Sequence, residues 1–498
     1  MNTLRKWIYN SAIYNFILAF CRLAEKSFFF KPTVYATYNE KQEIYQHTAI
    51  YKSLSFIGKF FEKFFAKLRL AWESSIIVGF LKDLMGTIAK NTLIGKMIKQ
   101  FNIVYLIPFY VYIDFFTRKY IPSVSSIWDE LLFVVMVLWI IARRILRNKK
   151  YRFTSLDLPI VLFAMVYLFL LFVNSPELDV AIEGYRAVVQ YIFWFFIVVQ
   201  LIDTKEVAYR MVWAFIIAIG LLGLHGMYQY FTHAPMLGNW VDSGETITTR
   251  AYSIIKSPNA LGSVLVLNIP VALSMFIAEK DILKKILAIL FTSFMGFGLL
   301  FTFTRGAWVV GFFAVILLFI FVSRRLIIVI ATMATAALIY INALWSRASY
   351  LFTPEYQAKA ARGGRTYRWA AALTEWSESK AIGLGLGRYG GAVAMNHKLS
   401  QFYVDNYYVK TIAEVGLIGL ISLLLLIIIT IRQVYLYIKN TKDITVRILM
   451  YGMFSGILAV VGHNFVENIF ESPFMVTYFW SYVAIIIAMN KIDCSKEA

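Results

Sequence analysis

The sequence predicts an all-α, polytopic membrane protein with about twelve transmembrane helices and one long external loop. Of its 498 residues, 60% are hydrophobic and only 16% are charged, whereas a soluble domain carries about 25% charged residues. The apolar residues form repeated blocks of about 20, the length that crosses a bilayer. These blocks are continuous rather than alternating. Because lipid offers the backbone no hydrogen-bond partners, we expect helices rather than the strands of a barrel.

The order of basic loops along the chain predicts the topology. Spans are expected at about 101–117, 129–142, 157–173, 187–202, 211–231, 259–278, 283–302, 306–322, 325–345, 412–431, 447–463 and 474–490. Short loops rich in Lys and Arg stay in the cytoplasm, and the strongest such cluster runs from Arg143 to Arg152. Alternation from this loop places both termini inside and residues 346–411 outside. Three further basic loops also fall inside, at 284–285, 324–325 and 432–447.

Residues 1–100 differ from the predicted spans in their pattern of charged and apolar residues. The segment 57–68 alternates lysine with aromatic residues at helical spacing, which is typical of a helix lying in the membrane interface with its lysines toward anionic headgroups. We therefore expect a basic, amphipathic, cytoplasmic arm that binds anionic membrane lipids, with docking of a regulatory partner as the alternative. The remaining chain divides into transmembrane helices at 101–345, the external loop at 346–411, transmembrane helices at 412–490 and a cytoplasmic tail at 491–498.

The composition also excludes several classes of function. The net charge of +20 would suggest nucleic acid as a partner for a soluble protein, but here the arm and the cytoplasmic loops account for most of it, so no nucleic acid is expected. The two cysteines, Cys21 and Cys494, lie near opposite ends on the predicted cytoplasmic side, where thiols stay reduced. No disulfide framework, metal site or cofactor is predicted.

Arginines on the predicted external side indicate an anionic ligand. Residues 346–411 contain nine basic and four acidic residues, and guanidinium groups bind phosphate oxygens in a bidentate manner. The arginines predicted to bind substrate are Arg186, Arg250, Arg305, Arg365, Arg368 and Arg388. Arg305 is the most informative, because an arginine at the end of an apolar span is costly unless it has a function or reaches the membrane surface. A membrane-surface anchor beside Trp308 is the alternative for it.

A motif after the external loop resembles a known signature. Residues 405–419 read DNYYVKTIAEVGLIG, with ten residues between Asp405 and Gly416. If both residues were helical they would share one face, and Gly416 and Gly419 would let a neighbouring helix approach closely. This pattern resembles the signature of the O-antigen ligase and polymerase superfamily. The resemblance extends over about residues 150–490 and includes the order of Arg186, Pro258-Asn259, Thr304-Arg305-Gly306, Arg365 and Asp405.

The resemblance implies a membrane glycosyltransferase with GT-C-like architecture in the bacterial cytoplasmic membrane. Members of the superfamily move glycans from undecaprenyl diphosphate carriers outside the membrane, without a metal. By analogy, Arg305 and Arg365 would hold the diphosphate and Asp405 would act on the acceptor in an inverting transfer. Core ligases carry histidine where this chain has Asp405, so His463 and His397 are further candidates for a base. Asn406 and His463 are also expected to bind substrate. The alternative for Asp405 and Asn406 is that one of them caps the helix that follows.

Three alternatives remain open from the sequence. The acceptor is a growing glycan, a surface protein, or a lipid or wall anchor. Asp129 and Glu130 match the external acidic pair of another glycosyltransferase family, although such a pair also stabilises the positive end of a helix. A transporter or flippase of lipid-linked glycan is the rival from another class. It should show internal repeats and polar residues at the bilayer midplane, and neither pattern is present.

Overall fold

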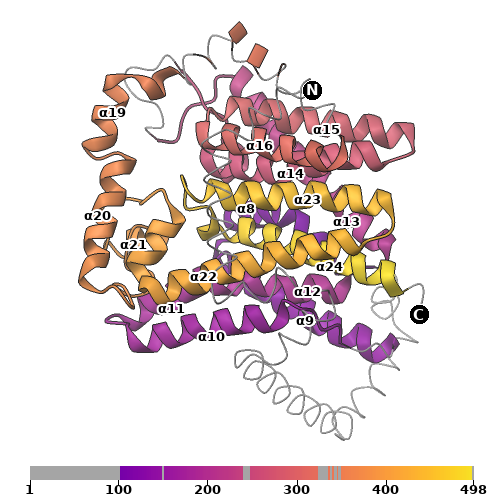
Figure 1. The fold of residues 1–498 in the computed structure, drawn as a ribbon, viewed down its shortest axis with the longest axis horizontal. Coiled ribbons are helices and arrows are strands. Elements are labelled where there is room, and N and C mark those ends of the chain that lie inside the picture. Colours follow the sequence, from indigo (N-terminus) through magenta and orange to yellow (C-terminus); the bar gives the residue numbers. More distant parts are fainter. Residues whose placement is uncertain are drawn as a thin grey trace, which may run out of the picture. The chain divides into compact units, whose positions relative to one another are not determined.

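The computed structural model describes residues 101–147, 151–238, 247–323 and 349–495, with a few single positions between 332 and 345. The chain divides into two compact units, 1–91 and 92–498, and all described residues belong to the second (Figure 1). The regular structure of the described part is entirely helical. The predicted arm at 1–100 and most of the predicted span at 325–345 lie outside the described residues.

Eight described helices are long and apolar enough to cross a membrane, which confirms a polytopic all-α membrane protein. The bundle consists of η1 (Ile103–Phe109), α8 (Tyr110–Tyr120), α9 (Trp128–Arg147), α10 (Asp157–Val173), α11 (Leu178–Val189), η3 (Gln190–Phe193), α12 (Trp194–Leu201), α13 (Lys205–Phe231), α14 (Pro258–Ala278), α15 (Ile282–Phe301), α16 (Arg305–Val322), α22 (Tyr407–Asn440), α23 (Ile444–His463), η6 (Ile469–Glu471) and α24 (Pro473–Ser495). The helices α8, α9 and α10 are not among the eight, so the described helices do not establish the predicted count of twelve.

Three predicted helix starts were wrong, and one of them is the fifth span, which begins at Lys205 rather than 211. The fourth span begins at Leu178 rather than near 187, because α11 continues through η3 into α12 as one helix of 24 residues. Arg186 therefore lies within α11 and does not open a span. The tenth span begins at Tyr407 rather than 412, since the side chain of Asn406 accepts hydrogen bonds from the backbone of Tyr408 and Val409, both at 3.1 Å. This arrangement is an N-cap, so the capping alternative holds for Asn406 and not for Asp405.

The most buried helices lie at the centre of the bundle. In the most apolar stretch of each helix, 89% of the residues of α24 and 78% of those of α14 are buried, against 28% for α15 and for α16. Helix α14 packs against α13, α15, α16 and α23. Ser257 caps α14 and Pro258 occupies its first turn, a combination that fixes where a helix begins. The start of α14 is therefore held in the middle of one end of the bundle.

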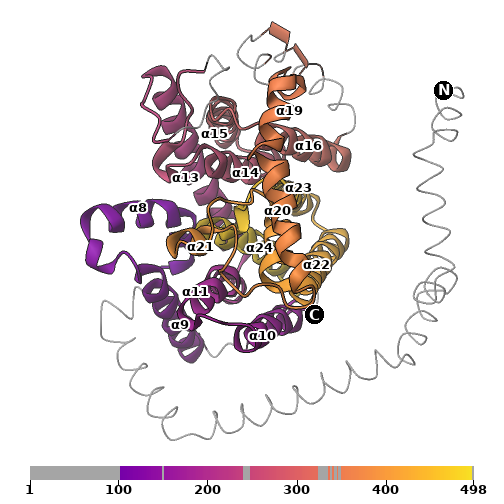
Figure 2. The ribbon, with the colours of Figure 1, turned by 90° about the vertical axis from the view of Figure 1, so that its left-hand side faces the viewer.

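The two ends of the bundle differ in character. One end holds charged pairs between loops that are far apart in sequence, such as Arg152 with Asp203 at 3.0 Å and Lys205 with Asp443 at 3.3 Å. The other end is covered by residues 349–406, predicted as a loop, which contain α19 (Pro354–Ala361), α20 (Arg365–Glu378) and α21 (Ala392–Asn396). Helices α19 and α20 run across the ends of the bundle helices (Figures 1 and 2).

Helix α22 is broken at Gly416, where φ is +60° and ψ is −163°. The segment after α20 closes over this break: Leu417 and Ile418 donate backbone hydrogen bonds to Lys380 and Ala381, and Leu384 donates one to Ala413, at 2.9 to 3.1 Å. The condition under which Asp405 and Gly416 would share a helical face is not met, because Asp405 precedes the helix and Gly416 is not helical. The residues that approach Gly416 belong to this segment and not to a neighbouring helix.

Candidate functional site

At the covered end of the bundle, one network of contacts joins the starts of four helices to the end of a fifth. The first residues of α16, α20 and α22 and the last residue of α23 are joined to the start of α14 by the contacts described below. Helix starts carry unsatisfied N–H groups and a partial positive charge, which together favour anions. This end of the bundle is therefore electrostatically suited to a negatively charged ligand even before its side chains are considered.

An arginine joins two carboxylates at the centre of this end. Arg365 lies 3.9 Å from Asp405 and 3.5 Å from Glu467, and Arg368 lies 2.9 Å from Asp405. Arg365 is at the first position of α20, Asp405 precedes the cap of α22, and Glu467 follows α23. The Nε atom of Arg365 is buried and has no hydrogen-bond partner among the described residues. The arginine thus retains a donor for a ligand.

A second row of contacts holds Glu467 from the opposite side. Asn259, in the first turn of α14, donates a 2.7 Å hydrogen bond to Glu467. The Asn259 oxygen in turn accepts hydrogen bonds from Arg250 at 3.2 Å and from the Thr304 hydroxyl at 3.1 Å. Arg250 also donates to Thr304, at 3.0 Å. Three predicted features, Arg250, Pro258-Asn259 and the Thr304-Arg305-Gly306 turn, therefore meet in one network.

The two carboxylates differ from ordinary surface acids in their titration. Burial and the nearby charge of Asp405 raise the pKa of Glu467 to about 7, although Arg365 and the Asn259 amide act in the opposite direction. Burial also raises the pKa of Asp405, against the lowering effect of Arg365 and Arg368. Two carboxylates that share an arginine share protons as a pair. The pair can therefore accept a proton near neutral pH, which is what a general base requires.

His463 completes the inner wall of the site. Its Nδ1 atom lies 2.8 Å from the Ser263 hydroxyl, which itself bonds to the carbonyl of Asn259 at 2.8 Å. If the hydroxyl donates to that carbonyl, it accepts from Nδ1–H, which leaves Nε2 of His463 as the acceptor. A Cβ atom on Gly306 would lie 3.1 Å from Nε2. A small residue at 306 therefore allows α16 to pass close to the buried imidazole.

Arg305 is held by aromatic rings. Its guanidinium lies 5.8 Å from the ring centre of Tyr350 and 5.1 Å from that of Tyr356, which lies in α19. Both distances are within the range of cation–π interaction. The arginine follows Thr304, the residue that links α16 to Asn259 and Arg250. Arg305 therefore joins the network through its neighbour, with its side chain directed toward the covering segment.

Other predicted site residues lie elsewhere or have other tasks. Arg186 pairs with Glu130, and Arg388 pairs with Glu177 at 2.9 Å. His397 lies 3.2 Å from Glu183. None of the hydrogen bonds or ion pairs described for these residues joins them to Asp405 or Glu467. Asn406 is the cap of α22. Asp129 and Glu130 lie in the first turn of α9, as predicted for an acidic pair that stabilises a helix start.

Sequence reasoning gave no role to Glu467 or to a triad of charged residues at this end. Glu467 contacts Asn259 across 208 positions of the sequence. Lys410, in the first turns of α22, forms 2.7 Å ion pairs with both Glu414 and Glu471. These two carboxylates also accept backbone hydrogen bonds from Tyr389 and Ala392. The triad therefore fastens the glycine-rich strap at 383–392 to α22.

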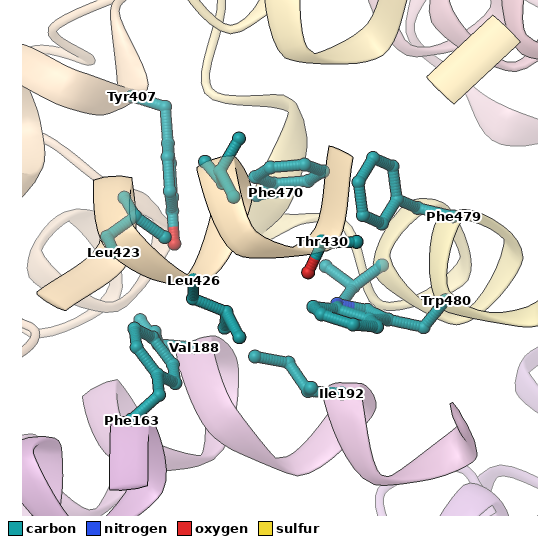
Figure 3. A pocket seen from close by; sticks show the side chains of 12 residues that line it. Phe163, Val188, Ile192, Tyr407, Leu423, Leu426, Thr430, Phe470, Phe479 and Trp480 are labelled. Atoms are coloured by element: carbon teal, nitrogen blue, oxygen red, sulfur yellow. The ribbon is translucent and has the colours of Figure 1, made fainter. Parts of the chain in front are cut away.

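An apolar cavity lies beside the polar network, between α22 and α24 on one side and α10, α11 and η3 on the other. Its volume of about 20 Å³ has room for roughly one water-sized molecule. The lining residues labelled in Figure 3 include Phe163, Val188, Ile192, Tyr407 and Trp480. Tyr407 is the first residue of α22, two positions after Asp405. The cavity therefore approaches the site from within the bundle.

The fold and this network define a polytopic membrane protein with an arginine–carboxylate site at one end of its helices. Residues 290–424 match the family model described as O-antigen ligase. The match includes Arg305, Arg365, Arg368, Asp405 and Gly416, and it confirms the resemblance to the O-antigen ligase and polymerase superfamily. It indicates a membrane enzyme that processes glycans. None of the curated proteins compared with the chain matches it.

Proposed function

We propose that the chain transfers a glycan from an undecaprenyl diphosphate carrier to an acceptor hydroxyl at the outer face of the bacterial cytoplasmic membrane. The observation that carries this proposal is the Asp405–Arg365–Glu467 bridge, which places two partly buried carboxylates and a cation at a point where four helices begin. The cation and the helix starts suit a diphosphate. The carboxylates suit proton removal from a hydroxyl.

The proposed reaction is a single displacement. The acceptor oxygen forms a bond to the anomeric carbon, the bond from that carbon to the diphosphate oxygen breaks, and the diphosphate departs with the electron pair. Attack opposite to the leaving group inverts the anomeric centre. The hydroxyl proton passes to the Asp405–Glu467 pair, while Arg365 and Arg305 hold the diphosphate. Diphosphate is already a good leaving group, so the scheme requires neither a metal nor a general acid.

Each arginine has a separable role in this proposal. Arg365 touches both carboxylates and keeps a free buried Nε donor, so it can move from the carboxylates toward a diphosphate oxygen as the donor binds. Arg368 holds Asp405 and also donates to the carbonyl oxygens of Gly363 and Tyr403, at 3.0 and 3.2 Å. Arg368 therefore positions the base. Arg250 is committed to Asn259 and Thr304 and positions Glu467 through them.

Transfer by the purified protein tests the proposal. Full-length protein in detergent is mixed with lipid-linked glycan from a strain lacking the chain, and the release of lipid diphosphate and the gain of glycan by the acceptor fraction are measured. Arg365→Gln should remove transfer. Lys284→Gln, which removes a cation at the first turn of α15 at the opposite end of the bundle, should leave transfer unchanged. Movement of lipid-linked glycan across vesicles without transfer would support the transporter alternative and overturn the proposal.

A further inference from the structure

Three aromatic rings form a surface next to the base, on the hydrophilic segment between α16 and α22. The Phe402 ring lies 6.3 Å from Tyr367 and 6.3 Å from Tyr389, measured between ring centres. The interplanar angles are 64° and 89°, so the rings meet edge to face. Tyr367 is 50% exposed. A half-exposed tyrosine in an aromatic cluster that lies outside the apolar spans is typical of a binding surface.

The aromatic surface is connected directly to the proposed base. Arg368 lies 5.9 Å from the ring centre of Phe402, and the same guanidinium lies 2.9 Å from Asp405. Tyr403, the residue after Phe402, is 41% exposed. A ligand resting on Phe402 would therefore have one end within reach of the carboxylate pair. This continuity distinguishes the cluster from the lipid-facing aromatic residues of the spans.

The surface is rigid and carries polar groups. Val404 donates a 3.0 Å backbone hydrogen bond to Gly390, and the Trp369 indole donates one of 3.0 Å to the carbonyl of Val404. These bonds fix the strap that bears Tyr389 against the segment that bears Phe402. Burial, with smaller contributions from Glu375 and Tyr367, raises the pKa of Tyr389 to about 12. The Tyr389 hydroxyl therefore keeps its proton at neutral pH and can donate a hydrogen bond to a sugar hydroxyl.

From this geometry we infer that Tyr367, Tyr389 and Phe402 form a binding subsite for sugar rings of the acceptor, and that the acceptor is itself a glycan. The apolar C–H face of a pyranose packs on aromatic rings, and its hydroxyl groups bond to the tyrosine hydroxyls. A terminal hydroxyl is then presented to the Asp405–Glu467 pair. The inference rests on the proposed function. It favours a polysaccharide polymerase over a ligase that modifies protein.

The subsite is tested by binding of free glycan. The probe is the glycan released by mild acid from the lipid-linked pool of a strain lacking the chain, titrated onto full-length protein in detergent and followed by saturation-transfer NMR. Loss of one stacking ring should weaken binding about three- to tenfold. Tyr367→Ala should show that loss, and Tyr367→Phe should keep the affinity. Leu373→Ala, on the same helix and 43% exposed, is the matched control.

Two outcomes overturn the inference. One is absence of binding of the free glycan to the wild-type protein, and the other is equal affinity for Tyr367→Ala and Leu373→Ala. Because Tyr367 is half exposed, its replacement should leave the fold intact, and Phe402→Leu provides a second test of the same surface. If transfer occurs and Tyr367→Ala does not raise the KM for glycan acceptor, the subsite is wrong and the proposed function stands. If glycan binds through Tyr367 and no transfer occurs, the proposed function is wrong.

Discussion

The replacement Asp405→Asn separates a catalytic carboxylate from a structural one. Asn406 caps α22 through its own side chain, so the change at 405 does not remove the cap. Asparagine keeps the size of aspartate but cannot accept a proton, and it cannot form the ion pairs with Arg368 and Arg365. General base catalysis contributes about 10² to 10⁴ in rate, equivalent to roughly 3 to 5.5 kcal/mol of activation free energy. We expect the rate of transfer by Asp405→Asn to be lower than that of the wild type by a factor of about 10² to 10⁴.

Asp405→Asn should not weaken binding of the donor. Removal of one negative charge beside two arginines leaves the site more positive, so a lipid diphosphate should bind as tightly as before or more tightly. The assay is transfer from lipid-linked glycan with purified protein, together with donor affinity measured on the same samples. Asn406→Asp is the matched control, since aspartate caps a helix as well as asparagine does. If Asp405→Asn keeps a third or more of the wild-type rate, Asp405 is not part of the base.

The pH profile tests which carboxylate holds the proton. Burial and the charge of Asp405 raise the pKa of Glu467 to about 7, so the pair loses its proton, and becomes an effective base, as the pH rises through 7. Transfer by the wild-type protein should therefore increase across that range. In Asp405→Asn the negative charge that raises the pKa of Glu467 is absent. The pH at which any residual activity begins to rise should therefore be lower than in the wild type. A profile that is the same in both proteins would show that the two groups do not titrate together.

Four further predictions test other parts of the structure. Arg305→Lys should not restore transfer, because lysine keeps the charge but loses the planar donors that match phosphate; normal activity would make this residue an anchor. Glu467→Gln should become more stable to heat than the wild type as the pH rises from 5 to 8. A carboxyl whose pKa is raised in the folded state destabilises the fold when it ionises, and glutamine does not ionise. A difference in Tm that stays constant with pH would contradict the raised pKa. Gly416→Ala should destabilise the fold far more than Gly363→Ala: both residues have positive φ, but a Cβ at 416 would lie 2.4 Å from the backbone of Ala381 and one at 363 meets nothing within 4 Å. A reporter fused after Gly390 should be active only outside the cytoplasm, and cytoplasmic activity would refute the external location.

Sequence reasoning predicted the features that depend on local composition. The membrane fold follows from hydropathy, and the superfamily and the grouping of Arg365 with Asp405 in one site follow from the resemblance. The partners of Arg186 and Arg388 did not follow, because charge and side of the membrane do not say where around a bundle a residue lies. Both pair with nearby acids, Glu130 and Glu177, rather than with the central network.

The role of Glu467 shows a second limit. Nothing in its local sequence distinguishes it from an acid that ends a helix, and its significance comes from Asn259, 208 positions earlier. The role of Asn259 depends in turn on Arg250 and Thr304, which donate hydrogen bonds to its side-chain oxygen. The only signal in the sequence was a polar residue in the first turn of the buried helix α14. That signal becomes specific only when the helices are packed together.

The spacing in the signature has a different physical meaning from the one that the sequence suggested. Asp405 and Gly416 bracket a short helical segment, 407–415, whose two ends are fixed independently. At one end Asn406 caps the helix and its backbone N–H bonds to Asn468 at 3.1 Å, and at the other the segment after α20 crosses the break at Gly416. Between them Lys410 binds Glu414 and Glu471. The ten residues between Asp405 and Gly416 therefore set how far Asp405 lies from the crossing segment, and so place it beside Arg365. An insertion or deletion there would move Asp405 away from its arginines even if the helix itself remained intact.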